Sequence, residues 1–319
     1  MPKVSVIVAV YKMEPYIERC VRSLFCQTLD DMEFIFIDDA SPDASISIVK
    51  EVLEEFPERK KQVKFVTHTA NRGIAAVRQS GVDASEGEYI IHCDADDWVE
   101  RDMYEVMYRA ATETGADISG CDIYREYGDR TEYVKEWFDL PAQELTIELL
   151  KGEKMHAYLP IRLIKASFIR QTGIKFDEKL SSLEDMQYLF PLHLKAGKTA
   201  YIARALYHYD RSVPTSLTRT KNQSIFDSHV SVYRHLASIL PHQTYMPHLK
   251  RRFGDLLFFY IMSARQYNPS KWLKEYKPII EDTELPLSKR ERISIWLIER
   301  GFWRLNYLIL LAGKVGFKR

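Results

Sequence analysis

Three aspartates stand close together at the end of an apolar stretch of the chain. Residues 89–92, YIIH, read as a short buried strand, and Asp94, Asp96 and Asp97 follow shortly after it, within four positions of one another. Carboxylates this close repel one another unless a positive charge lies among them. A divalent cation is the usual solution, and a bound cation can in turn hold a diphosphate. The spacing therefore predicts a cation and nucleotide site, and a nucleotide-dependent transferase is the first function to test.

A second acidic pair, Asp38 and Asp39, ends the predicted strand 33–37. Helix capping explains the following Ser41 and Pro42, which make a good start for a helix. Capping leaves the consecutive carboxylates unexplained. A carboxylate at a strand end can accept a hydrogen bond from the imide N–H of uracil or from the ring of another base, so Asp39 is predicted to bind a ligand.

The run NRGIAAVRQSG, residues 71–81, opens a predicted helix over residues 74–84. Gly73 permits a tight turn, and the helix N-terminus favours a negatively charged partner. Two roles remain open for Arg78, which either contacts a ligand or lies on a solvated helix face. Gly81 indicates close packing rather than chemistry.

Alternating strands and helices must position these residues. Continuous apolar runs predict buried strands, and runs with apolar residues on one face predict helices. The predicted strands are 4–10, 33–37, 63–66 and 89–92, and the helices between them are 14–27, 42–56 and 74–84. This order predicts a doubly wound α/β sheet with right-handed crossovers, in which ligands bind beyond the carboxyl ends of the strands.

The rest of the chain divides into a less regular part and a helical part. Predicted strands 118–127 and 130–137 flank a turn, and a helix is predicted over 184–194. The helices predicted beyond residue 222 are 225–240, 246–266, 271–280 and 289–311. We therefore expect two parts, an α/β domain over residues 1–220 and a helical C-terminal extension over residues 221–319.

Composition and charge exclude several classes of protein. The chain has 319 residues, of which 46% are hydrophobic and 28% charged, and no net charge, so it is globular without a global attraction to nucleic acid. From Pro286 to Arg319, eight Lys or Arg and two Glu give a net charge of +6, which leaves −6 on the first 285 residues. A basic, aromatic end on an acidic body predicts a local anionic partner.

Cysteine usage and hydropathy bear on the compartment. The four cysteines, Cys20, Cys26, Cys93 and Cys121, lack CxxC spacing, so buried free thiols are predicted in place of a zinc site or a redox dithiol. No segment reads as a signal peptide, and no window approaches the ~20 apolar residues that span a bilayer. The sequence therefore predicts a cytoplasmic protein.

Several dispersed motifs agree in order and spacing with one known family. They are VSVIVAVY, SLFCQT, EFIFIDDASPD, NRGIAAVRQSG and EGEYIIHCDADD. Over roughly residues 1–215 the chain resembles the family 2 inverting glycosyltransferases, which have the GT-A fold, a Rossmann-like doubly wound mixed sheet. The resemblance implies a nucleotide-diphosphate-sugar donor, often linked to UDP, and a Mg²⁺ or Mn²⁺ ion.

The resemblance also implies roles for individual residues. Asp39 would contact the base, and Arg78 would lie near the base and the phosphates. The D-x-D pair, Asp94 and Asp96, would contact the ribose and the metal. The donor-nucleotide site predicted in this way comprises Val10, Tyr11, Asp39, Asn71, Arg78, Asp94 and Ala95. The chain departs from the family pattern at Lys12, Ala40 and Gln79, where asparagine, glycine and asparagine respectively are common.

Inverting transfer needs a base that takes the proton of the acceptor hydroxyl. The resemblance assigns this role to Asp185 in the run LEDMQYLF, although acids at a helix N-terminus also favour the helix by themselves. In the stretch YHYDRSVPTS, Arg211 is predicted to neutralise the diphosphate as a loop closes over the donor. His208 is either a further metal ligand or a structural residue, and His92 is expected in the core.

The predicted helix 289–311 combines many apolar and aromatic residues with four arginines. Such a helix packs on the rest of the chain, forms a homodimer interface, or rests on an anionic membrane surface. Membrane contact would place the protein peripherally on the inner face of the membrane and would favour a lipid-linked acceptor.

These features predict a metal-dependent hexosyltransferase. It would move a sugar from a nucleotide-diphosphate donor to a hydroxyl of a saccharide or lipid-linked saccharide, in the synthesis of a surface polysaccharide. One alternative is a non-catalytic binding or assembly subunit. The argument against it is that four acids are intact, namely Asp39, Asp94, Asp96 and Asp185. The other is a sugar nucleotidyltransferase, which typically has a glycine-rich basic loop after the first strand, whereas residues 11–14, YKME, contain no glycine.

Overall fold

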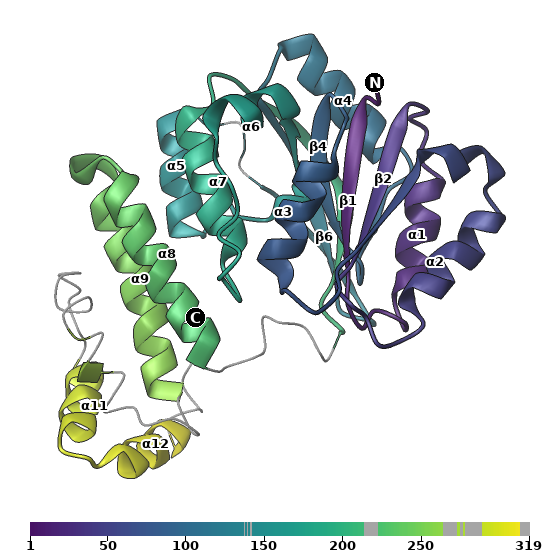
Figure 1. Cartoon of the computed structure of the whole chain (residues 1–319). Coiled ribbons are helices and arrows are strands. Elements are labelled where there is room, and N and C mark those ends of the chain that lie inside the picture. The colour runs from purple at the N-terminus through teal and green to yellow at the C-terminus, as the bar shows by residue number, and fades with distance from the viewer. Residues whose placement is uncertain are drawn as a thin grey trace. The chain divides into compact units, whose positions relative to one another are not determined.

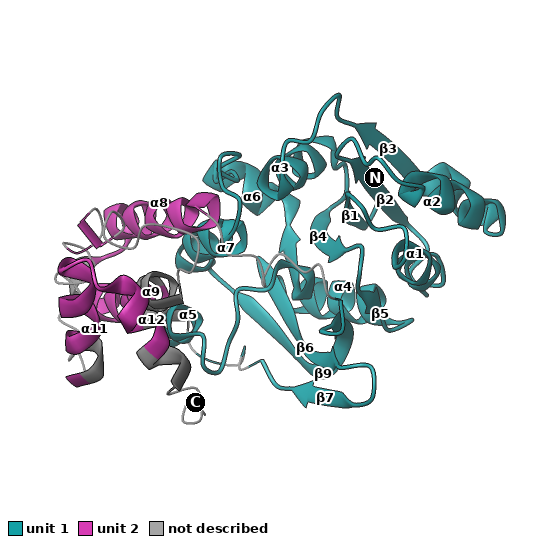
Figure 2. Ribbon diagram, turned by 90° about the horizontal axis from the view of Figure 1, so that it is seen from below, with its two compact units in different colours: residues 1–217 teal, residues 218–319 magenta. Residues whose placement is uncertain are grey.

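The computed structural model describes residues 1–136, 138, 140, 142–213, 223–263, 273, 274, 277 and 289–312. The chain divides into two compact units, residues 1–217 and residues 218–319, which Figure 2 distinguishes by colour. The domain boundary predicted at residue 220 lies outside the described residues.

A mixed sheet forms the centre of the first unit (Figure 1). Its strands are β1 (Val4–Val10), β2 (Met32–Asp38), β3 (Val63–Thr67), β4 (Tyr89–Asp94), β5 (Trp98–Val99), β6 (Ile118–Glu126), β7 (Thr131–Val134), β8 (Arg162–Lys165) and β9 (Thr199–Asp210). Their order is β3-β2-β1-β4-β8-β6-β9-β5, with β7 paired to β6. Strands β1 to β4 are parallel, whereas β8 runs antiparallel to β4 and β6. The predicted Rossmann-like mixed sheet is therefore confirmed.

Helices follow most strands of this unit. They are α1 (Ile17–Phe25), α2 (Ser45–Glu54), α3 (Ile74–Ala84), α4 (Met103–Thr114), α5 (Ala142–Lys151), α6 (Ala166–Thr172) and α7 (Glu184–Lys195), with 3₁₀ turns η1 (Pro57–Gln62) and η2 (Leu159–Ile161). Residues of α1, α2 and α4 share a core with alternate residues of β1, such as Val6 and Val8. Helix α3 packs on β1 and β2, and a Cβ at Gly81 would lie 2.2 Å from the side chain of Ile7. Close packing therefore explains Gly81, as predicted.

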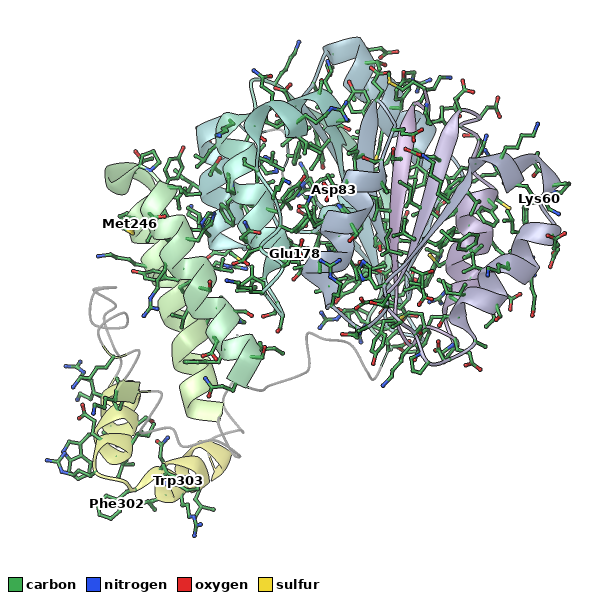
Figure 3. The ribbon with its side chains drawn as sticks, in the orientation of Figure 1. Lys60, Asp83, Glu178, Met246, Phe302 and Trp303 are labelled. Carbon is green, nitrogen blue, oxygen red and sulfur yellow. The ribbon has the colours of Figure 1, made fainter. Side chains whose placement is uncertain are left out.

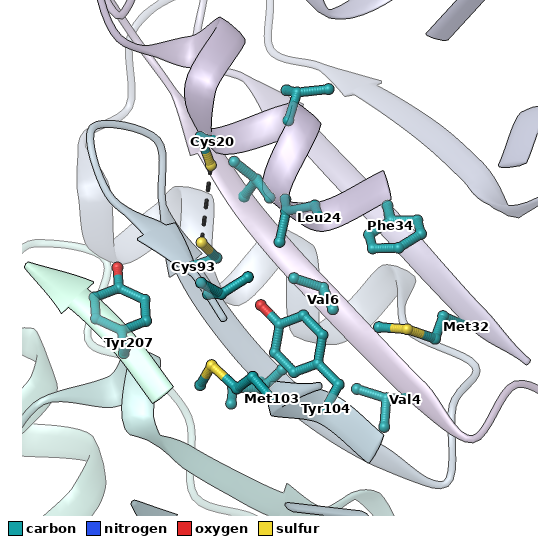
Figure 4. Packing of buried hydrophobic residues seen from close by; sticks show 14 of the residues in the cluster. Val4, Val6, Cys20, Leu24, Met32, Phe34, Cys93, Met103, Tyr104 and Tyr207 are labelled. Atoms are coloured by element: carbon teal, nitrogen blue, oxygen red, sulfur yellow. Dashed lines mark hydrogen bonds between the residues drawn. The ribbon is translucent and has the colours of Figure 1, made fainter. Parts of the chain in front are cut away.

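The thiols of this unit lie mostly in the core. Figure 4 shows Cys20 beside Cys93, with their Sγ atoms 3.8 Å apart and no disulfide between them. Cys121 is also buried, whereas Cys26 is exposed. The prediction of buried free thiols is thus confirmed for three of the four cysteines and is wrong for Cys26.

One predicted helix start is wrong. Helix α2 begins at Ser45 rather than near Pro42, and Ser41 does not cap it. The hydroxyl of Ser41 instead accepts a hydrogen bond of 2.8 Å from the N–H of Lys12, because the intervening residues form a loop against the end of β1.

The described part of the second unit is helical wherever its secondary structure is regular. Its described helices are α8 (Gln223–Ile239), α9 (His242–Ser263), α11 (Lys289–Glu299) and α12 (Trp303–Ala312). The prediction of one helix over 289–311 is wrong, because the chain turns at Gly301, whose φ is 79°. Figure 3 labels Phe302 and Trp303 at this turn. Most of the predicted helix 271–280 lies outside the described residues, and among the residues that are described no helix is long and apolar enough to cross a bilayer.

Candidate functional site

The two acidic runs open at one edge of the sheet. Val10 is the register partner of Asp38 across β1 and β2, and Ala9 is the partner of Asp94 across β1 and β4. The carboxyl ends of neighbouring parallel strands meet at the same edge. The loops after β2 and β4 therefore flank the end of β1, as a nucleotide site at this edge requires.

The loop after β4 is anchored by its third aspartate. Asp97 is buried and accepts a hydrogen bond of 2.6 Å from the hydroxyl of Tyr207 on β9. Arg19 on α1 donates to the carbonyl of Asp96 at 2.9 Å. Asp97 is thus a structural anchor, and the other two acids, Asp94 and Asp96, keep partly exposed side chains.

Asp94 and Asp96 have the chemistry of a cation site. Burial, together with the charge of Asp94, raises the pKa of Asp96 to about 6, because two carboxylates in one small loop repel each other. Within the described residues, no group of three or more His, Cys, Asp or Glu side chains could hold a metal ion by itself. Mg²⁺ is commonly held by one or two carboxylates with substrate phosphates and water. The pair therefore fits a metal ion that is completed by a diphosphate.

Arg78 joins the D-x-D loop to helix α7. Its side chain is 5% exposed, and its guanidinium nitrogens lie 3.2 Å from Asp94 Oδ1, 3.3 Å from Glu184 Oε1 and 3.4 Å from Asp185 Oδ1. Although burial opposes the charged form, the three carboxylates hold the pKa of Arg78 above its ordinary value. The alternative of a solvated helix face is wrong, because Arg78 is the buried counter-charge of the site.

Asp185 stands in the first turn of α7. Leu183, just before this helix, has a φ of 60°, a left-handed conformation that is uncommon for such a residue and concentrates at functional sites. Burial raises the pKa of Asp185 well above its ordinary value, while Arg78 opposes the shift. The Oδ1 atom of Asp185 is buried and accepts no hydrogen bond. A carboxyl group whose pKa is raised in this way is suited to act as a general base.

Asp39 clamps the loop that precedes α3. Its Oδ1 accepts a hydrogen bond of 2.9 Å from the N–H of Arg72 and lies 2.7 Å from Nδ1 of His68. Its Oδ2 accepts one hydrogen bond of 3.0 Å, from the N–H of Gly73, whose φ of 85° suits glycine. A carboxylate oxygen has two lone pairs, so Oδ2 keeps one for a ligand. The predicted contact with a base stays a prediction, and the clamp is a second role that sequence reasoning missed.

The loops after β1 and β2 are bonded to each other. Besides the bond between Lys12 and Ser41, the N–H of Met13 donates to the hydroxyl of Ser45 at 2.9 Å. Lys12 and Ala40 have φ values of 58° and 55°, a conformation in which glycine or asparagine is less strained. These are two of the positions where the chain departs from the family pattern.

The remaining residues predicted to bind the donor nucleotide differ in whether their side chains are exposed. Tyr11 and Asn71 are exposed, so their side chains are available at the edge of the sheet. Val10 and Ala95 are buried and can offer a ligand only their backbone groups.

His208 has no ring nitrogen left for a metal ion. Nδ1 lies 2.7 Å from a carboxylate oxygen of Glu126, and Nε2 lies 2.9 Å from one of Glu100. The ring also stacks on Trp98, with centroids 4.9 Å apart. The structure therefore favours the structural role that was left open for His208. His92 is buried, with its ring against Phe176, and belongs to the core as expected.

Arg211 lies just beyond β9. Its side chain is exposed, its guanidinium lies 5.6 Å from the centroid of the Tyr209 ring, and its N–H donates to the carbonyl of Glu126 at 2.8 Å. Its predicted contact with a diphosphate stays a prediction.

Sequence reasoning missed two partners of the site. Glu184 shares Arg78 with Asp185, and its place beside the predicted base was a usable signal. Tyr207 could not be found in the same way, because its partner Asp97 is 110 positions away and no local pattern joins them.

Comparisons with known proteins bear on the family and the fold of this chain. Residues 5–173 match the family described as glycosyl transferase family 2. The glycosyltransferase EpsJ of Bacillus subtilis is 31% identical over 236 residues, covering 72% of this chain and 67% of EpsJ. Residues 1–349 of TarS of S. aureus, solved in complex with UDP-GlcNAc, match with a TM-score of 0.74 at 17% identity, and the match covers 98% of this chain and 91% of that TarS fragment. The mannosyltransferase PcManGT of Pyrobaculum calidifontis, in complex with GDP-Man and Mn²⁺, has a TM-score of 0.53 at 17% identity, covering 98% of this chain and 88% of PcManGT.

Proposed function

Because this chain belongs to glycosyl transferase family 2, we propose that it moves a sugar from a UDP-linked donor to a hydroxyl group of a saccharide or lipid-linked saccharide, with inversion. The observation that carries the proposal is the position of Arg78. One buried guanidinium lies within 3.4 Å of both Asp94, in the D-x-D loop, and Asp185, at the start of α7. A donor-binding acid and a candidate base are thereby held in one site.

The donor is proposed to lie along the edge of the sheet after β1, β2 and β4. Asp39 Oδ2, next to the Gly73 amide, would receive the base, and the exposed Tyr11 would border it. The complex of TarS with UDP-GlcNAc supports a uridine nucleotide, whereas the complex of PcManGT with GDP-Man makes a guanosine nucleotide the alternative to test.

Asp94 and Asp96 would hold Mg²⁺ or Mn²⁺ together with the donor diphosphate. The metal ion would supply Lewis-acid stabilisation of the charge on the departing diphosphate. The Mn²⁺ in the PcManGT complex supports this proposal for the fold. Arg78 would hold Asp94 in place, because its guanidinium lies 3.2 Å from Asp94 Oδ1.

Asp185 would act as the base. It would take the proton from the acceptor hydroxyl as the hydroxyl oxygen forms its bond to the anomeric carbon and the bond to the diphosphate breaks. Its raised pKa and its Oδ1 atom, which accepts no hydrogen bond, suit this task. Arg78 would limit the rise in the pKa of Asp185.

The second unit supports a peripheral contact with a membrane. Ile293, Trp296, Phe302, Leu305 and Leu308 are each about half exposed on α11, α12 and the turn between them. The arginines among them that are also exposed are Arg292, Arg300 and Arg304. Exposed aromatic and aliphatic side chains beside arginines fit an anionic lipid surface. We therefore propose that the protein works at the inner face of a membrane on a lipid-linked acceptor, in the synthesis of a surface polysaccharide.

Calorimetric titration tests the donor site. UDP and GDP are each added with and without Mn²⁺ to the wild type, to Asp96→Ala and to the control Glu113→Gln, whose exposed carboxylate is on α4. Tighter UDP binding with Mn²⁺, lost in Asp96→Ala and kept in the control, is expected. If the wild type binds GDP and not UDP, the donor is a guanosine nucleotide in place of a uridine nucleotide. If the wild type binds neither nucleotide, the proposal is contradicted.

A further inference from the structure

Arg125, near the end of β6, is a half-buried cation without a carboxylate partner. Its Nη2 donates to Nε2 of His156 at 3.3 Å. No carboxylate in the described part of the chain lies within 4.0 Å of its guanidinium, and its Nε is buried without a hydrogen-bond partner. A half-buried charge without a partner is costly, so a ligand of opposite charge is expected beside it.

The neighbours of Arg125 do not neutralise it. His156 must accept the bond at Nε2, because a guanidinium has only donors, so its proton is on Nδ1, which donates to Glu136 Oε1 at 2.7 Å. Both ring nitrogens of His156 are thus occupied, one as acceptor and one as donor. The charge of Glu136 pairs with Arg162, whose Nη2 lies 3.2 Å from Oε2, and both of these side chains are fully buried. The positive charge of Arg125 is therefore not neutralised by these neighbours.

Aromatic rings surround this charge. His156 stacks on Tyr158 with centroids 5.0 Å apart, and Tyr158 lies 5.8 Å from the ring of Tyr209. Tyr209 is the register partner of Arg125 across β6 and β9. Half-buried aromatic rings beside a guanidinium offer a flat apolar surface together with directed N–H donors, which suits a sugar ring that bears an anionic group.

The cluster lies close to the D-x-D loop. Tyr209 is two residues beyond Tyr207 on the same face of β9, a separation of about 7 Å along a strand. The hydroxyl of Tyr207 bonds both Asp97 and the N–H of Asp94. The aromatic cluster therefore shares β9 with the tyrosine that anchors the loop that would hold the donor diphosphate.

We propose that Arg125, His156, Tyr158 and Tyr209 form an acceptor subsite for a saccharide that carries a negative charge. The charge is a phosphate or a carboxylate, either of which accepts two parallel N–H bonds from a guanidinium. This proposal rests on the proposed transferase function and narrows its acceptor to an anionic class.

Ligand-observed NMR at millimolar concentrations tests the subsite. The probes are glucose 6-phosphate, glucuronate and the neutral methyl glucoside, each added with and without UDP and Mg²⁺. The wild type should bind at least one anionic probe more tightly than the glucoside. Arg125→Gln should weaken that binding about tenfold or more, the size expected for a charge-assisted hydrogen bond, and leave the glucoside unchanged. Arg125→Lys should keep part of the affinity.

Controls separate this inference from the proposed donor site. Arg109→Gln removes an arginine of α4 whose side chain is 66% exposed, and it should bind every probe like the wild type. Unchanged UDP affinity in Arg125→Gln would show that the variant is folded. If Arg125→Gln loses binding of only the phosphate probe or only the carboxylate probe, that result identifies the anionic group that Arg125 binds. Equal binding of the anionic probes by wild type and Arg125→Gln, or no binding of them by a wild type that binds UDP, would overturn the subsite.

Discussion

Arg78 Nη2 lies 3.4 Å from Asp185 Oδ1, so a guanidinium on α3 contacts the proposed base on α7. The same group is 3.2 Å from Asp94, and no other arginine, lysine or histidine of the described chain lies within 4.0 Å of either carboxylate. The charge balance of the site therefore depends on one side chain.

Replacing Arg78 by Gln should destabilise the protein strongly. The change leaves one buried acid and two partly buried acids without a counter-charge, and breaking a buried ion pair costs about 3–5 kcal/mol. Urea unfolding measures the effect. Arg72→Gln is the control, because Arg72 and its partner Glu178 are each almost half exposed and such pairs contribute about 0–1 kcal/mol. Equal losses in both variants would refute a special role for Arg78 in the fold.

Asp185→Asn should lower kcat about 10²–10⁴-fold and leave the affinity for the donor nucleotide unchanged, because a base acts on the acceptor hydroxyl. Steady-state kinetics and nucleotide titration measure the two effects separately. Glu178→Gln, an exposed carboxylate shortly before the same helix, should retain full activity. A kcat of Asp185→Asn within a factor of about three of the wild type would remove Asp185 from the mechanism.

Stability should fall in acid partly through Glu33. Burial alone would raise the pKa of Glu33, but hydrogen bonds from Ser5, Lys64 and the N–H of Glu86 hold it below its ordinary value. The unfolded chain then binds more protons than the folded one in this range. The contribution of Glu33 is complete above the unfolded pKa of about 4.3 and disappears as the pH falls through the lower folded pKa.

Unfolding free energies of Glu33→Gln between pH 7 and pH 3 check this linkage. The variant should be less stable than the wild type at pH 7, and the difference should shrink toward pH 3. Glu51→Gln on the exposed side of α2 serves as the matched change and should follow the wild-type curve. A difference between Glu33→Gln and wild type that does not vary with pH would contradict the assigned cause.

Ala40→Gly should stabilise the protein by up to about 1 kcal/mol. A left-handed residue with a Cβ atom costs roughly 1–2 kcal/mol, and the greater freedom of glycine in the unfolded chain offsets part of this gain. Thermal unfolding measures the change. The opposite sign is expected for Ala110→Gly inside helix α4, where glycine costs about 1 kcal/mol.

The exposed apolar and basic residues of α11 and α12 should bind anionic vesicles. Flotation with phosphatidylglycerol vesicles should carry the wild type into the lipid fraction, and neutral phosphatidylcholine should do so less. Replacing Arg292, Arg300 and Arg304 by Gln should weaken binding about 10²-fold, at about 1 kcal/mol for each charge. Arg109→Gln is the control for loss of a charge elsewhere. The same lipid fraction for wild type and triple variant on anionic vesicles would rule out the proposed contact.

Local patterns were sufficient for the parallel half of the sheet. The predicted helix 74–84 coincides with α3, and strand β1 coincides with the predicted run 4–10, because continuous apolar runs and one-sided helices are properties of neighbouring residues. The short strand β8 and the long strand β9 escaped prediction, since their partners are distant in the sequence.

The site was only partly predictable for a similar reason. Short motifs identified Asp94, Asp96 and Asp185 as candidate site residues. The contacts of Arg78 with Asp94, Glu184 and Asp185 could not be predicted in this way, because they join segments that are far apart in the chain. Gly301 was a readable helix stop that the apolar pattern of residues 289–311 concealed. The sequence indicates which charged side chains are present, and the packing of the fold decides which acidic side chains pair with the same arginine.

The hydrogen bonds between the loops after β1 and β2 have a consequence for protein engineering. The N–H groups of Lys12 and Met13 donate hydrogen bonds to the hydroxyls of Ser41 and Ser45. The conformation of each segment therefore depends on the other. A chimera that imports one loop from a relative with a different nucleotide preference would lose these matching contacts. Donor specificity should therefore be transplantable only when both loops are exchanged together, as one cassette.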